Sequence, residues 1–101
     1  MKKRITHTYR IVWRGITLQI RHQPLYFDYG ADHIEIHVKK PKDAIIPITE
    51  TGYRSHFIDE EELKQAGGPV AFVTAWLDRE GNTKKWIKRE LASRQLELFP
   101  K

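Results

Sequence analysis

The sequence of 101 residues contains no cysteine. Without a thiol the chain can form neither disulfides nor thiolate metal sites, and it has no cysteine nucleophile; this fits a reducing, cytoplasmic setting. Long apolar runs, repeats and low-complexity tracts are also missing, so no segment has the length and composition of a membrane span. The basic start at residues 1–4 lacks the apolar continuation of a signal peptide, and we expect neither export nor membrane anchoring.

Acidic residues are scarce in the first half of the chain. Residues 1–58 hold ten basic and five acidic side chains, whereas residues 59–101 hold eight of each, which gives a net charge of +5. In the second half the acids gather at residues 59–62 and the bases at residues 84–94. Such a polarised, basic surface raises the rate of encounter with polyanions.

Alternation of apolar and polar residues predicts strands in the first half. Residues 9–14 and 16–21 alternate on either side of Gly15, which predicts a β-hairpin with its turn at residues 13–16. Residues 34–39 predict a third strand with one buried face. A fourth, at residues 44–48, is limited by Pro41 and Pro47 to an edge or irregular role.

From Asp59 onward the period is helical. Asp59 and Glu62 have the spacing of a capping box, and Gly67-Gly68 stops this helix after about two turns. Pro69 suits the first turn of a second helix, whose apolar positions 70, 72, 73, 76 and 77 share one arc, and Gly81 ends it.

A third helix is expected to begin at Asn82 as its N-cap. Its residues Trp86, Ile87 and Leu91 are predicted to face inward. The sequence therefore predicts an α+β fold, in which an antiparallel meander of three to four strands is followed by two or three helices packed on one sheet face. Residues 1–94 form the domain, and residues 95–101 are a linear motif or a helix-end tail.

The chain ends in a specific short motif. It reads Gln-Leu-x-Leu-Phe and consists of Gln95, Leu96, Leu98 and Phe99 around Glu97. This closely resembles the pentapeptide by which bacterial proteins dock on the DNA-polymerase sliding clamp. The resemblance implies that the glutamine hydrogen-bonds at the rim of a groove while the apolar side chains fill its pockets. Glu97 is a mild departure, because Ser or Asp is usual there. Alternatively, the apolar residues close the protein's own core.

Two basic sets are candidates for phosphate contacts. On the polar face of the predicted sheet, Thr17 and Gln19 accompany bases, and the second set lies on the polar side of the last helix. The candidate residues are Arg10, Arg14, Arg21, Lys39, Lys84, Lys85, Lys88 and Arg89. Three aromatic residues of the loop at residues 23–31, Tyr26, Phe27 and Tyr29, either stack on bases or plug one end of the core.

The polar face of the third strand also carries His33, Glu35 and His37. These residue types bind zinc or a similar ion, with a further ligand from His7 or His22, but no spacing fixes such a partner. We expect no metal and no cofactor. The alternative is a polar surface on which Glu35 raises the pKa values of both histidines.

A hydrolase is a further possibility, because Glu50, Ser55 and His56 lie close together in sequence. A nucleophile and a base adjacent in one segment rarely meet in hydrogen-bonding geometry, and the nucleophile-elbow pattern is missing. We expect no enzymatic activity.

Residues 13–18 and 48–57 are similar to short proteins from proteobacterial genomes and their plasmids and phages. That resemblance implies no particular activity and favours replication, mobile-element or counterdefence roles. We therefore expect a non-enzymatic accessory protein that docks on the sliding clamp through residues 95–99. The alternative is a nucleic-acid-binding module, or a phage or mobile-element inhibitor of a host nucleic-acid-processing complex.

Overall fold

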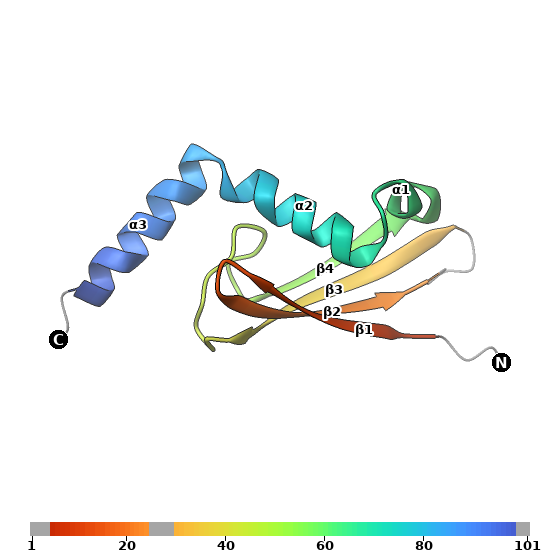
Figure 1. The fold of residues 1–101 in the computed structure, drawn as a ribbon, viewed down its shortest axis with the longest axis horizontal. Helices are drawn as coiled ribbons and strands as arrows, with labels where there is room; N and C mark the ends of the chain where they lie inside the picture. Colours follow the sequence, from red (N-terminus) through yellow and green to blue (C-terminus); the bar gives the residue numbers. More distant parts are fainter. Residues whose placement is uncertain (1–4, 25–29, 99–101) are drawn as a thin grey trace.

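The computed structural model describes residues 5–24 and 30–98, and the side chains of this part as far as residue 94. Four strands come first and three helices follow (Figure 1). The strands are β1 (His7–Trp13), β2 (Ile16–Gln23), β3 (Ala31–Lys40) and β4 (Tyr53–Asp59). The helices are α1 (Glu60–Gln65), α2 (Pro69–Gly81) and α3 (Lys84–Leu98).

The strands form one antiparallel sheet in the order β1-β2-β3-β4. The predicted α+β class with a strand meander followed by helices is thus confirmed. The β1–β2 turn consists of Arg14 and Gly15, whose φ angles of 47° and 82° both lie in the left-handed region. Glycine adopts this region without strain, which is why the predicted turn falls at Gly15.

The fourth strand was predicted in the wrong place. Residues 44–48 contribute only an isolated bridge between Ile46 and Thr49, whereas β4 begins at Tyr53. The apolar signal was real, because Ile46 and Ile48 are buried in the core, but it comes from a loop. The β4 signal was weak because this edge strand alternates polar residues with exposed aromatic ones.

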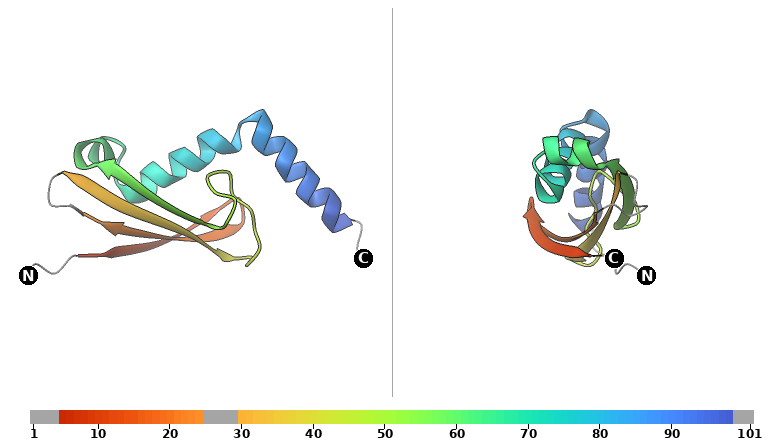
Figure 2. Two further views of the ribbon diagram at one scale, coloured as in Figure 1. Left: turned by 180° about the vertical axis from the view of Figure 1, so that it is seen from behind. Right: turned by 90° about the vertical axis from the view of Figure 1, so that its right-hand side faces the viewer.

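One face of the sheet forms the core. Leu18, Ile20, Ile34 and Ile36 point to this inner face and are fully buried. The helix α2 lies across it and contributes Val73 and Leu77, also fully buried (Figure 1). Seen from the end, α1 and α2 lie on one side of the curved sheet (Figure 2). Among the described residues, none of the helices combines the length and the apolar composition that a bilayer span requires.

The helix ends agree with prediction at one place and differ at another. Asp59 is the N-cap of α1, and its carboxylate accepts hydrogen bonds from the backbone of Glu61 and Glu62. Asn82, expected to begin the third helix, is instead the C-cap of α2. The hydroxyl of Thr83 accepts from the Trp86 amide at 3.2 Å and so caps α3.

The helix α3 turns away from the sheet after this corner (Figure 1). Trp86 is buried as predicted, but Ile87 and Leu91 are 46% and 51% exposed and do not face inward. The inward prediction failed because it assumed that the sheet extends beneath the whole of α3.

The tip of the β1–β2 hairpin meets the corner between α2 and α3. The indole nitrogen of Trp13 donates to Asp78 at 2.9 Å, and the Arg14 guanidinium donates to the carbonyl of Gly81 and the side chain of Asn82, both at 3.3 Å. A Cβ on Gly81 would lie 2.8 Å from the Trp13 ring. The close approach of helix and hairpin therefore requires glycine at this position.

We predict that Gly81→Ala lowers the free energy of unfolding by about 1–3 kcal/mol, because the added methyl group clashes with Trp13. Helix propensity alone predicts the opposite sign, with a gain of at most about 0.5–1 kcal/mol, because that range applies to the middle of a helix and Gly81 is the last residue of α2. Urea denaturation of the variant measures the difference. Ala75→Gly, at an exposed position of α2, serves as the control for propensity. A stabilised Gly81→Ala protein would contradict the packing described here.

Candidate functional site

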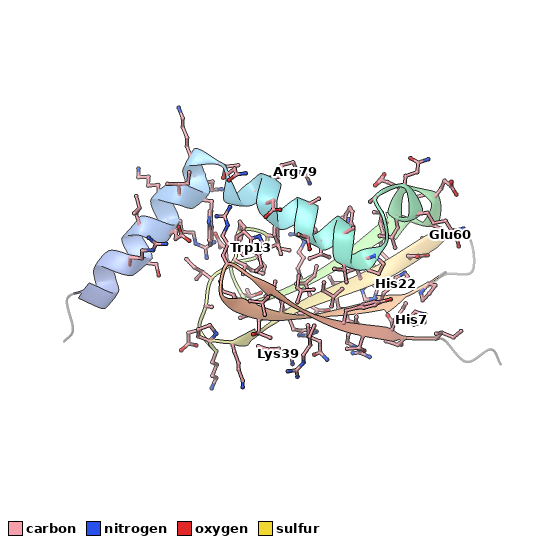
Figure 3. The ribbon with its side chains drawn as sticks, viewed as in Figure 1. His7, Trp13, His22, Lys39, Glu60 and Arg79 are labelled. Carbon is pink, nitrogen blue, oxygen red and sulfur yellow. The ribbon has the colours of Figure 1, made fainter. Side chains whose placement is uncertain are left out.

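The outer face of the sheet, opposite α2, is the first candidate for a functional surface. Since side chains alternate along a strand, every second residue of each strand belongs to this face. Lys39 projects from the side of the sheet away from α2, whereas Trp13 points to the helix side (Figure 3). The outer-face residues are Thr8, Arg10, Val12, Thr17, Gln19, Arg21, Gln23, His33, Glu35, His37, Lys39, Tyr53, Ser55 and Phe57.

Strand register arranges these side chains in rows across the sheet. The three best-defined rows are Gln23-His33-Phe57, Thr8-Arg21-Glu35-Ser55 and Arg10-Gln19-His37-Tyr53. Each row ends on the edge strand β4, at Phe57, Ser55 or Tyr53, and its other members are polar or charged. Neighbours within a row are close enough to interact directly.

Glu35 lies at the centre of the face and interacts with three cationic or titratable groups. Its Oε1 atom is 3.7 Å from Nη1 of Arg21 and 3.4 Å from Nε2 of His37, and its Oε2 atom is 3.7 Å from Nδ1 of His33. The carboxylate thus offsets part of the positive charge that the sequence predicted for this surface. The remaining bases, Arg10 and Lys39, form no ion pair within the described part of the chain.

His33 is almost fully buried and uses both ring nitrogens. Nδ1 lies 2.8 Å from Oε1 of Gln23, and Nε2 lies 2.7 Å from the hydroxyl of Ser55. A neutral ring satisfies both bonds, with Nδ1 donating to the amide oxygen and Nε2 accepting from the hydroxyl.

Burial lowers the pKa of His33, and Arg21 adds to this effect, although Glu35 opposes it. Glu35 thus acts in the expected direction, but the expected net rise in the pKa of His33 was wrong, because the pKa is lowered. Desolvation of the ring outweighs the attraction of a carboxylate that is itself shared with Arg21 and His37.

The histidines proposed as additional metal ligands lie elsewhere. His22 is on the inner face, where its Nε2 atom is 2.7 Å from Oδ2 of buried Asp32, and His7 packs its ring beside that of His22. Across the described residues, no three His, Asp or Glu side chains are arranged to hold a metal ion.

Two aromatic residues on β4 were missed by the sequence analysis. Phe57 and Tyr53 are 48% and 43% exposed, and their rings lie 4.6 Å and 4.7 Å from the rings of His33 and His37. The sequence pattern that could have revealed them is the spacing of Tyr53, Ser55 and Phe57, which places all three on one face of a strand. The aromatic residues predicted to stack, Tyr26, Phe27 and Tyr29, lie outside the described residues.

The predicted basic residues fall into three groups. Arg10, Arg21 and Lys39 lie on the outer face, but Arg14 lies in the β1–β2 turn, with its guanidinium 4.6 Å from the Trp13 ring centre. The remainder, Lys84, Lys85, Lys88 and Arg89, are on α3. Because α3 leaves the sheet at the corner, they do not extend the outer face (Figure 1).

Ser55 and His56 point to opposite faces of β4 and do not form a pair. His56 packs between Phe72 and Trp76 of α2 at ring distances of 5.7 Å and 4.8 Å. Ser55, which is exposed, is hydrogen-bonded to His33 instead. This contact orients the histidine. The absence of enzymatic activity stays a prediction.

The clamp-like motif lies at the end of α3. The backbone of Gln95, Leu96 and Leu98 continues this helix across the expected domain boundary at residue 94. Phe99 and the side chains of Gln95, Leu96 and Leu98 lie outside the described part of the structure. Docking on a sliding clamp therefore stays a prediction.

A family model described as the KlcB third domain matches residues 6–86. The match covers more than half of the chain and includes the sheet, α1, α2 and the first residues of α3. No curated protein and no solved structure matches the chain.

We predict that the protein loses stability on acidification through its histidines. Burial lowers the pKa of His33 and also of His56, where Arg54 acts in the same direction and Glu62 opposes it. Both rings thus bind protons more tightly in the unfolded chain. Their contribution to the free energy of unfolding is complete above the ordinary histidine pKa of 6.5 and is lost as the pH falls through the lowered folded-state values.

Urea unfolding between about pH 7.5 and about pH 5 measures this dependence. Replacing His33 by Gln should flatten it, whereas His7→Gln, at an exposed position, is the control. An unchanged pH dependence in His33→Gln would show that this ring does not contribute.

Proposed function

The chain belongs to the KlcB third-domain family, which makes it an accessory protein of the phage and mobile-element type, and we propose that it binds single-stranded nucleic acid on the outer face of the sheet. One observation carries the proposal: the outer face, which lies opposite the helix α2 (Figure 2), combines bases with exposed aromatic rings.

Exposure of the two rings supports a stacking role. Phe57 and Tyr53 lie four residues apart on the same face of β4, which places them about 13 Å from each other in an extended strand. Each ring already contacts a histidine, so its position on the sheet is defined. Bases of a single strand stack on such rings irrespective of sequence, whereas the bases of a duplex have no free faces.

The charges on the outer face suit a phosphate backbone. Arg10 projects from β1 and Lys39 from the end of β3, and neither is neutralised by an acid in the described part of the chain. Arg21 is shared with Glu35 at 3.7 Å and offers a weaker site. A strand that crosses the face can thus place its phosphates near Arg10 and Lys39 and its bases over β4.

Docking on a sliding clamp is a second candidate, favoured by the position of the motif. The family match ends at residue 86, so the Gln-Leu-x-Leu-Phe sequence follows the shared domain rather than forming part of it. The helix that leads to the motif projects away from the sheet (Figure 1). We propose that α3 presents residues 95–99 to a groove on the clamp. The two functions are compatible, because they use different surfaces.

We predict that Phe57→Ala weakens binding of a short oligothymidylate by roughly tenfold, because stacking contributes about 1–3 kcal/mol per base. Leu91→Ala, which truncates an equally exposed apolar residue on α3, should leave binding unchanged. Fluorescence anisotropy with a labelled oligonucleotide measures both. Equal affinities for the wild type and Phe57→Ala would remove the stacking proposal.

The phosphate contacts are tested separately, through the salt dependence of the binding affinity. Each contact to a single strand contributes about 0.7 to the slope of log affinity against log salt concentration. We predict that Arg10→Gln reduces this slope by about that amount. Arg79→Gln changes the charge equally at an exposed position of α2, away from the outer face of the sheet, and is the control. A reduced slope in the control alone would place the nucleic acid on another surface.

For clamp docking, we predict that Leu96→Ala combined with Phe99→Ala weakens binding to a purified bacterial clamp at least tenfold, since a few buried anchors carry most of the affinity of such motifs. Calorimetric titration measures this effect, with Ile87→Ala as the control on the same helix. Equal heats for the double variant and the wild type would exclude the proposal. Thermal unfolding of the double variant tests whether these residues pack on the protein's own core.

A further inference from the structure

A pocket lies beside the corner between α2 and α3, on the helix side of β4. It has a volume of about 360 Å³, and its walls come from the loop at residues 47–50, from β4, and from both helices at the corner. Small-molecule sites in proteins commonly have volumes of about 300–1,000 Å³. The pocket is therefore large enough for a small ligand and is separate from the outer face.

Three bases line this pocket. Arg54 comes from β4, and Lys85 and Arg89 come from the first turns of α3. Within the described residues none of the three forms an ion pair. Like charges that converge on one concave surface repel each other and create a positive potential there. An anionic group in the pocket would relieve this repulsion.

Both arginines are held against tryptophan rings. The guanidinium carbon of Arg54 is 5.3 Å from the ring centre of Trp76, and that of Arg89 is 5.6 Å from the ring centre of Trp86. This contact restrains the guanidinium through its flat face, and the N–H groups at its edge stay available. Such donors match the paired oxygens of a phosphate or a carboxylate.

One residue that lines the pocket also carries a hydrogen-bond donor without a described acceptor. Trp86 lines the pocket and is only 4% exposed. Its indole nitrogen is buried and has no hydrogen-bond partner in the described part of the structure. Buried donors of this kind are rare in folded proteins and call for an explanation.

Two carboxylates in the pocket restrict the kinds of ligand that it can bind. Glu50 and Glu80 line the same pocket, together with the hydroxyl groups of Thr49 and Thr83. A simple anion would be repelled by the carboxylates. A ligand that carries hydroxyl or amino donors as well as an anionic group can use both kinds of side chain.

We propose that this pocket binds a small phosphate ester that also carries hydroxyl or amino donors, which is the chemistry of a nucleotide. Arg54, Lys85 and Arg89 bind the phosphate, and Glu50 and Glu80 accept hydrogen bonds from the rest of the ligand. The site does not depend on nucleic-acid binding by the outer face, since it lies on the other side of the sheet.

Adenosine monophosphate is the test ligand, and tryptophan fluorescence is the readout because Trp86 lines the site. Titration of the full chain should give saturable quenching, with adenosine and inorganic phosphate each binding at least tenfold more weakly. Quenching by adenosine with the same affinity would show that the phosphate is not recognised. Equal affinity for inorganic phosphate would show that the carboxylates play no part. Either result, or no binding, would overturn the proposal.

Arg89→Gln should weaken binding of adenosine monophosphate at least tenfold. Lys88→Gln removes the same charge from the adjacent exposed position, which does not line the pocket, and should bind as the wild type does. Lys85→Gln is the second test variant, because its side chain is exposed and removal of its charge leaves the core intact. Identical affinities for Lys85→Gln, Lys88→Gln and the wild type would place the ligand elsewhere.

Discussion

The contact between the hairpin tip and the end of α2 determines which side of the sheet stays open. Trp13 fits against Gly81 and donates to Asp78, and Arg14 holds the carbonyl of Gly81. These contacts fix one end of α2 over the inner face, where Val73 and Leu77 complete the core. The helix α2 covers the inner face together with α1 and the loop that contains Ile46 and Ile48. The outer face must therefore remain polar or be used for binding.

This constraint explains the chemistry of the outer face. A half-buried polar surface is stable only if its groups satisfy one another, and His33 does so by joining Gln23 on β2 to Ser55 on β4. Glu35 is likewise surrounded by Arg21, His33 and His37. The centre of the face is thus internally compensated. The side chains that offer charge or a stacking surface to a ligand lie toward the edges of the face. They are the cations of β1 and β3 and the aromatic rings of β4.

The sequence predicted those parts of the fold that depend on local patterns. Alternation defined the first three strands, Gly15 marked the turn, and Asp59 and Pro69 marked two helix starts. The fourth strand and the inward face of α3 were mistaken because each depends on tertiary context. Ile46 and Ile48 are apolar since a loop packs on the core, and Ile87 is exposed since α3 extends beyond the sheet. Periodicity cannot reveal either condition.

For the binding surfaces, the sequence indicated which residues could bind a ligand more readily than which of them share one surface. Arg10, Arg21 and Lys39 were assigned to one face by alternation alone, as found. Arg14 was assigned there too, but the left-handed backbone of the turn directs it to the α2–α3 corner. The pocket at that corner had no sequence signature, because its two groups of lining residues, at 47–54 and at 80–89, are distant in the chain and meet only through the fold.

The edge strand β4 separates the two proposed sites. Tyr53 and Phe57 point to the outer face, while Arg54 points to the helix side, where it rests on Trp76. Because successive residues of a strand face opposite ways, a shift of β4 by one residue would exchange the stacking rings with the pocket arginine. The hydrogen bond between Ser55 and His33, together with the burial of Ile58, holds the register that keeps both surfaces intact. Both surfaces thus depend on the pairing of β4 with β3.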